Sequence, residues 1–277
     1  MRRDFAGAIN VTAATAERTS QPDALLSVEG ISKRFGGVQA LKDVSFAIGR
    51  NEVVGLIGPN GSGKSTCVNL LSGSLPVSAG QVRLKGELIT GRPIYEVVAR
   101  GLARTFQATQ VFPEYTARQN VLIGCHALFR SGTLGSIARS AGAVREQHEM
   151  ATQTDEVLDF VGLGARKDQV AATLSAAEQR LLMIAVALAA KPDLVLLDEP
   201  AAGMVAGERR ALARIIRDLP RRGISALVIE HHMGLIMEVC DRIVVLNFGE
   251  KIAEGTPAEI RANRAVVDAY LGHRDHA

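Results

Sequence analysis

Hydrophobic positions in the first third of the chain follow the period of β-strands. Between residues 25 and 49 apolar side chains alternate with polar ones, which predicts short strands. Residues 53–57 are apolar without alternation, a pattern typical of a strand buried on both faces. A glycine-rich turn at Gly58 separates this strand from a helix predicted at about residues 64–72, and residues 82–88 predict a second hairpin.

The middle of the chain changes to a helical period. From Thr116 to about Thr173 the apolar residues recur at helical spacing. The last third returns to alternating strands and helices, with short branched apolar runs at residues 194–197, 226–229 and 243–246. Such runs are typical of parallel strands that are covered on both faces. We therefore predict an α/β fold whose mostly parallel sheet is interrupted by a helical segment.

Composition places the chain among ordinary globular proteins. Of its 277 residues 47% are hydrophobic and 22% are charged, which excludes global disorder. Lys and Arg total 32 against 29 Asp and Glu, so the net charge of +3 gives little support to a nucleic-acid partner. The longest apolar run, residues 181–190, is too short to span a bilayer. The three cysteines lack metal-ligand spacing and are expected to be free thiols.

The two ends of the chain are expected to be tails. Polar residues interrupt the apolar stretch after Phe5, so residues 1–24 predict a disordered tail better than a signal peptide. We expect the folded domain to cover residues 25–272 and a short tail to occupy residues 273–277.

Residues 58–66 match the phosphate-loop pattern G-x-x-x-x-G-K-[ST] at every position, between a predicted strand and a predicted helix. Glycine allows backbone N–H groups to turn inward around a phosphate, and the helix N-terminus adds partial positive charge. Lys64 would reach the β- and γ-phosphates and Ser65 would bind Mg²⁺. A glycine-rich turn alone would not explain Lys64 followed by Ser65. The predicted nucleotide-binding residues of this loop are Gly58, Asn60, Gly61, Gly63, Lys64, Ser65 and Thr66.

Two further strand ends carry chemistry. Asp198 and Glu199 follow a predicted buried strand, where ligands of open α/β sheets collect. Asp198 is the candidate Mg²⁺ anchor, and Glu199 is the candidate base that polarises the attacking water. His231 follows the next predicted strand and is a candidate contact to the γ-phosphate. The alternative is that His231 and His232 are simply a pair of solvent-exposed histidines. Gln107 is either a polar loop residue or part of this site.

The ordered set of these motifs, with Phe35 and residues 174–179, resembles the nucleotide-binding domain of ATP-binding cassette (ABC) transporters. Residues 103–107, 198–204, 229–231 and 255–257 resemble the branched-chain amino acid ATP-binding subfamily. The resemblance implies a P-loop NTPase core, an antiparallel β subdomain and an α-helical subdomain at about residues 112–175.

The same resemblance assigns roles to individual residues. Phe35 would stack on adenine, although a strand-edge packing role is the alternative, and Gln107 would join Mg²⁺ to the permease contact. His231 would be the switch histidine. Ser175 and the backbone at Ala177 would bind the ATP held by a second ABC ATPase subunit, in a homodimer or heterodimer.

The implied cofactors and partners are ATP and Mg²⁺, two transmembrane permease subunits and, indirectly, a solute-binding protein. The chain would lie peripherally on the cytoplasmic face of the inner (plasma) membrane. The permease contact is expected in the helical segment, where Phe129 and Arg130 look exposed.

Four positions depart from the family pattern. Ala176 and Ala177 replace two signature glycines, and they are strained if either needs a positive φ but tolerated if both are helical. Val205 stands where a polar turn is usual, and His232 replaces an aspartate. The departures at Ala176, Ala177 and Val205 keep one alternative open, a catalytically weak regulatory subunit. The ATPase of a lipid-related exporter is a second alternative, because a fold does not determine the transported solute.

Overall fold

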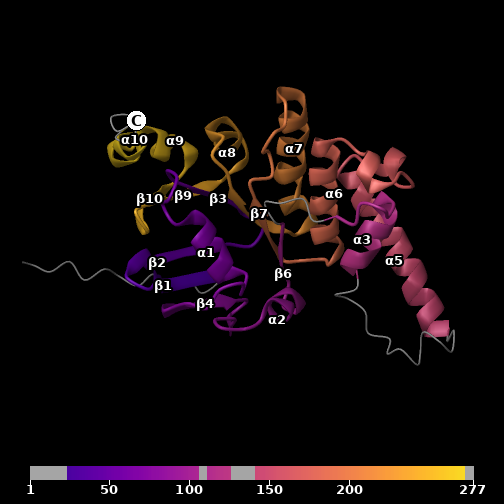
Figure 1. Ribbon diagram of the computed structural model, residues 1–277, viewed down its shortest axis with the longest axis horizontal. Coiled ribbons are helices and arrows are strands. Elements are labelled where there is room, and N and C mark those ends of the chain that lie inside the picture. The colour runs from indigo at the N-terminus through magenta and orange to yellow at the C-terminus, as the bar shows by residue number, and fades with distance from the viewer. Residues whose placement is uncertain (1–23, 106–110, 126–140, 272–277) are drawn as a thin grey trace, which may run out of the picture.

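The computed structural model describes residues 24–105, 111–125 and 141–271 (Figure 1). Gln107, Phe129, Arg130 and the two predicted tails, apart from Ala24, lie outside the described residues. The proposed boundaries of the domain and of the helical subdomain stay predictions.

A six-stranded sheet forms the centre of the molecule. Its neighbouring strands are parallel, except that the edge strand β10 runs antiparallel to β9. Every residue of β3, β7 and β8 is buried, as their uniformly apolar runs predict. In spatial order the strands are β10 (Glu250–Gly255), β9 (Arg242–Asn247), β3 (Val53–Ile57), β8 (Ser225–Ile229), β7 (Leu194–Asp198) and β6 (Leu102–Arg104).

A second, antiparallel sheet lies beside the first. Its strand order is β2 (Val38–Ile48), β1 (Leu26–Phe35), β4 (Ala79–Leu84) and β5 (Glu87–Leu88). The pair β4 and β5 confirms the predicted second hairpin. The prediction of short strands was wrong for β1 and β2, which have 10 and 11 residues. Register shifts between Val28 and Arg34 break the alternation of β1, so one long strand looks like several short ones.

Helices cover the sheets and fill the middle of the chain (Figure 1). The described part of segment 112–175 contains α3 and α5 and two 3₁₀ helices, η2 (Gly164–Arg166) and η3 (Ala171–Thr173). Helix α1 directly follows the loop after β3. The α-helices are α1 (Lys64–Leu71), α2 (Ile94–Ala99), α3 (Ala117–Cys125), α5 (Ala141–Phe160), α6 (Ala176–Ala189), α7 (Ala206–Asp218), α8 (Met233–Val239), α9 (Pro257–Ala262) and α10 (Arg264–Leu271).

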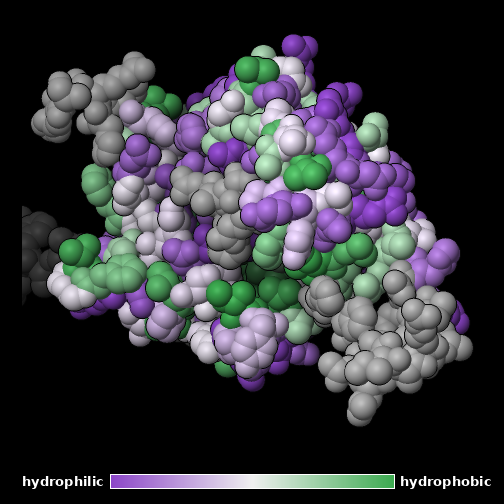
Figure 2. Space-filling view, turned by 45° about the vertical axis from the view of Figure 1, so that its right-hand side comes forward, coloured by the Kyte–Doolittle hydropathy of each residue, from purple (hydrophilic) through white to green (hydrophobic). Residues whose placement is uncertain are grey.

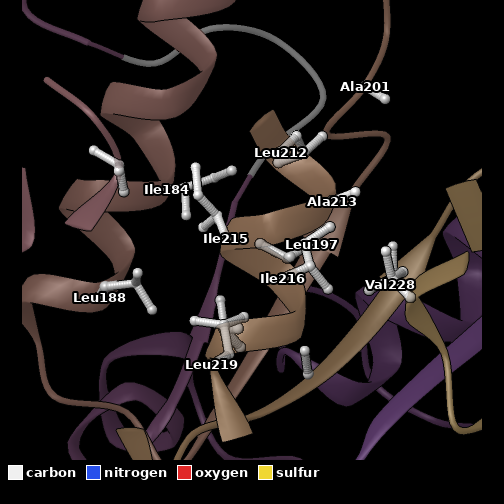
Figure 3. Close-up of a cluster of buried hydrophobic side chains, with 14 of the residues drawn as sticks. Ile184, Leu188, Leu197, Ala201, Leu212, Ala213, Ile215, Ile216, Leu219 and Val228 are labelled. Carbon is white, nitrogen blue, oxygen red and sulfur yellow. The ribbon is translucent and has the colours of Figure 1, made fainter. Parts of the chain in front are cut away.

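Two hydrophobic cores lie on opposite faces of the parallel sheet, because successive strand residues point to opposite sides. Val195 and Leu197 of β7 belong to the core that they share with α6 and α7. Leu194 and Leu196 belong to the core that they share with α1 and the antiparallel sheet. Figure 3 shows this cluster, in which Leu197 of β7 lies close to Ile216 of α7, with Ile184 and Leu188 of α6 on one side and Val228 of β8 on the other. The strand ends are therefore held between two packed layers, which fixes the residues that follow them.

The surface mixes polar and apolar side chains. On the face in Figure 2 hydrophilic side chains cover most of the upper part, and hydrophobic ones form smaller patches lower down. Among the described residues, none of the helices is long and apolar enough to cross a bilayer. Cys67, Cys125 and Cys240 are free and buried, which confirms the prediction of free thiols.

Candidate functional site

The loop between β3 and α1 has a backbone that only glycine can form at two points. Gly58 has φ +155°, and a Cβ there would lie 2.1 Å from the Leu246 carbonyl oxygen. Gly63, with φ +102°, would place a Cβ 2.8 Å from the Ala40 oxygen. The loop therefore packs tightly beneath, against β9 and β2, while Asn60 and Gly61 are exposed above.

The donors of this loop suit an anion. The first N–H groups of α1 have no intrahelical partners, as in any helix, and the N-cap residue Gly63 has no side chain to accept from them. The Ser62 hydroxyl is buried and has no hydrogen-bond partner among the described residues. Ser65 and Thr66 follow in the first turn of α1. Orphaned donors, a helix N-terminus and a glycine cradle together fit a phosphate group.

Lys64 lies folded onto the loop itself. Its Nζ donates hydrogen bonds to the carbonyl oxygens of Gly58 and Pro59 at 2.8 and 2.9 Å. Burial lowers the pKa of Lys64 below its usual value, and the negative charge of Glu199 opposes that shift. The loop carbonyls therefore hold the ammonium group in place, and it interacts electrostatically with the carboxylate of Glu199.

The two carboxylates at the end of β7 have different environments. Asp198 is buried and its Oδ2 accepts a hydrogen bond from the Arg104 guanidinium at 2.9 Å. Glu199 is partly exposed and leaves the strand with φ +49°, a left-handed conformation that costs a non-glycine residue about 1–2 kcal/mol. Its amide donates to the Ile229 carbonyl of β8, which ties the turn to the neighbouring strand.

Glu230 holds together the two turns that carry Glu199 and His231. This carboxylate is 1% exposed and accepts hydrogen bonds from the amides of Ala201, His231 and His232 at 2.7, 3.2 and 3.4 Å. The His231 side chain is 66% exposed. Glu230 is not among the residues predicted from the sequence, and the one signal for it is a charged residue directly after a buried strand.

Comparison with known proteins decides the family. The family model described as "ABC transporter" matches residues 41–202 of this chain. The model described as "Branched-chain amino acid ATP-binding cassette transporter" matches residues 250–276. The chain belongs to the ABC transporter ATP-binding proteins, in the branched-chain amino acid subfamily. As a member of that family the cassette is an ATPase whose hydrolysis of ATP is coupled to transport across a membrane.

Curated relatives and solved structures match over nearly their whole length. The cassette is 37% identical over 249 residues to the high-affinity branched-chain amino acid transport ATP-binding protein BraF of Pseudomonas aeruginosa, covering 90% of this chain and 98% of the relative. It is 37% identical over 254 residues to LivG of Escherichia coli, covering 91% and 99%. The crystal structure of a nucleotide-free ATP-binding cassette matches with a TM-score of 0.78 at 32% identity, covering 89% and 98% of the two chains. These matches confirm the predicted fold class.

The signature turn of the cassette is a helix start. Ser175 is the N-cap of α6, its Oγ accepts from the Glu178 amide at 3.2 Å, and Glu178 Oε2 accepts from the Ser175 amide at 2.8 Å. Ala176 and Ala177 are the first helical residues and have no positive φ. Of the two conformations considered, the relaxed helical one is observed. In Figure 1 α6 stands well to one side of α1, so this turn and Lys64 are not brought together within one chain.

The surroundings of three further positions discussed above, Phe35, Val205 and His232, are also seen in the structure. Phe35 ends β1 with 46% of its surface exposed, and the Lys33 ammonium lies 5.1 Å from the ring centroid. The ring is therefore not packed beneath the hairpin, and its stacking role stays a prediction. Val205 is exposed and its amide donates to Glu208. His232 is the N-cap of α8, because its Nδ1 accepts from the Leu235 amide at 3.2 Å. That bond shows that the histidine side chain fills the cap position of α8.

Proposed function

We propose that the cassette is the ATP-hydrolysing subunit of an importer for branched-chain amino acids or a related small polar solute. The names of the relatives and the C-terminal subfamily match support this cargo. The observation that carries the proposal is the clustering of the phosphate loop, Asp198, Glu199 and His231 at the ends of the neighbouring strands β3, β7 and β8.

Each residue has a proposed role in hydrolysis. Lys64 and the loop amides hold the β- and γ-phosphates, and Phe35 stacks on adenine. Glu199 takes a proton from the attacking water as the new P–O bond forms, and the bond to the leaving ADP oxygen breaks. His231 contacts the γ-phosphate. The products are ADP and inorganic phosphate, with the proton first on Glu199.

The chemistry of the donor side chains supports the proposed Mg²⁺ site. Ser65, Asp198 and Gln107 would supply oxygen ligands of the kind that Mg²⁺ prefers. Mg²⁺ supplies neutralisation of phosphate charge when it is bound.

The proposed assembly contains two ATPase subunits beneath two permeases, at the cytoplasmic face of the membrane, fed by a solute-binding protein. Ser175 and the Ala177 backbone of each subunit bind the γ-phosphate held by the other. Hydrolysis then requires closure of the pair, which links it to the permeases.

Reconstitution tests the proposal. The cassette, assembled with its permeases and binding protein in lipid vesicles, is expected to take up leucine only with internal ATP. Glu199→Gln should lower turnover by about 10²–10⁴-fold while ATP binding survives. Glu238→Gln, on the exposed face of α8, is the matched control and should keep the parent rate. ATP hydrolysis that is indifferent to leucine would refute the cargo, and an active Glu199→Gln complex would refute the role of Glu199.

A second candidate is a regulatory subunit that binds ATP while its partner hydrolyses. This candidate requires that the alanine signature still serves the partner's ATP, because Ala176 and Ala177 face that ATP and not the site of Lys64 and Glu199. In a heterodimer, disabling Glu199 and disabling the partner's equivalent glutamate would then have unequal effects. Single-turnover hydrolysis by the two variants separates the candidates. If nearly all hydrolysis survives loss of Glu199 and disappears with the partner's glutamate, the regulatory function is correct.

A further inference from the structure

Arg104 forms a buried ion pair with the proposed metal anchor. It is the last residue of β6, and its Nη2 lies 2.9 Å from Asp198 Oδ2. The two side chains are only 10% and 7% exposed. A guanidinium keeps its charge at every physiological pH, so Asp198 has a permanent positive neighbour.

The same guanidinium reaches the helix of the phosphate loop. Arg104 Nη1 donates to Asn69 Oδ1 at 2.7 Å and to Ser72 Oγ at 3.0 Å, both at the C-terminal end of α1. The next residue, Thr105, also contacts β7, because its hydroxyl accepts a hydrogen bond from the Asp198 amide at 3.2 Å. Arg104 therefore joins β6, β7 and α1 at a single point.

Burial makes the charge balance of Asp198 important. A buried carboxylate without a countercharge is costly, and removing one partner of such a pair leaves that cost uncompensated. A cation that approaches Asp198 meets the fixed charge of Arg104, and at these distances the repulsion is substantial in a partly dehydrated site. The arginine stabilises the carboxylate before a metal arrives and opposes the metal afterwards.

We propose that Arg104 is a positioning residue that serves as the resident countercharge of Asp198 and weakens Mg²⁺ binding at that carboxylate. The inference rests on the proposed function, because it takes Asp198 as the Mg²⁺ anchor. In this arrangement the site is preformed in the absence of metal, and Mg²⁺ with nucleotide replaces part of the charge that Arg104 supplies.

Titration of Mg²⁺ tests the inference without measuring hydrolysis. Binding of a non-hydrolysable ATP analogue to the full chain is followed as a function of Mg²⁺ concentration. Arg104→Gln, which is neutral and polar, should lower the half-saturating Mg²⁺ concentration by about 3–10-fold. It should also lower the melting temperature of the nucleotide-free chain and increase the stabilisation that Mg²⁺ and the analogue give.

Three comparison variants make the result specific. Arg104→Lys keeps the charge and should stay within about twofold of the parent half-saturation. Asn69→Ala removes another hydrogen-bond partner of Arg104 and should leave the half-saturating Mg²⁺ concentration unchanged. Arg100→Met changes an arginine on the surface, paired with Glu87 and Glu96, and is the control for loss of charge alone.

The outcomes separate this inference from the proposed function. An unchanged or raised half-saturation in Arg104→Gln would overturn it, as would equal losses of melting temperature with and without Mg²⁺ and analogue. If Arg104→Gln does not fold, Arg104→Lys decides, and a shift of more than about threefold in either direction overturns the inference. Asp198→Asn tests the metal anchor by itself, since Mg²⁺ dependence unaffected by that change would refute the anchor instead.

Discussion

Replacing Ala176 and Ala177 together with glycine should destabilise the cassette, although glycine is the family's usual residue at both positions. They are the first two residues of α6, and neither has a positive φ. Glycine costs about 0.5–1 kcal/mol relative to alanine at a helical position. Ala177 is also buried, so loss of its methyl group removes about 0.8 kcal/mol of apolar burial. The sum is about 2 kcal/mol, or roughly 4–8 °C in melting temperature for a chain of this size.

Thermal unfolding of the nucleotide-free chain, followed by circular dichroism, measures this change. Ala187→Gly, at a helical position within α6, calibrates the cost of glycine in the same helix. A double-glycine variant that melts at or above the parent temperature would show that the alanines are strained. Turnover of the assembled complex, measured in parallel, tells whether the added methyl groups also slow hydrolysis at the partner's site.

Three further changes have expected outcomes. Lys64→Ala removes a charged contact to phosphate, about 1.5–3 kcal/mol, so calorimetry should show affinity for an ATP analogue falling at least several-fold; unchanged affinity would contradict the loop assignment. His232→Ala should cost about 1 kcal/mol by loss of the α8 cap, whereas His232→Asp should melt close to the parent because aspartate also caps. The Ser175 amide lowers the pKa of Glu178, so the cap stabilises the fold above the unfolded-state pKa and loses that effect as the pH falls through the folded-state value. Glu178→Gln should therefore lower the melting temperature at pH 7 and have little effect in acid.

Features that depend on local pattern could be predicted from the sequence. The strands β3, β7, β8 and β9 each contain a continuous run of residues without polar side chains because both faces are covered, and that signal lies within each strand. The capping box at Ser175 was likewise readable, since its two partners are three residues apart.

Features that depend on distant contacts could not be predicted. Strand β6 has three residues, too few to show a period, and it is defined by pairing with β7, about 90 residues away. The exposed edge strand β10 lacks the apolar run that identifies the central strands. The roles of Arg104 and Glu230 could not be predicted, because their burial and their hydrogen-bond partners arise only when separate strands come together.

The three buried thiols turn the cassette into its own reporter of local opening. Burial raises the pKa of Cys67 and of Cys240 to about 12, so almost no reactive thiolate exists at neutral pH. Alkylation must then wait for a transient opening that exposes the sulfur, and its rate measures how often each segment opens. Cys67 lies in the helix that follows the phosphate loop, Cys125 ends α3, and Cys240 follows α8. Mass spectrometry of alkylated peptides would therefore compare the rates of local opening of three regions in one unlabelled, unmutated chain.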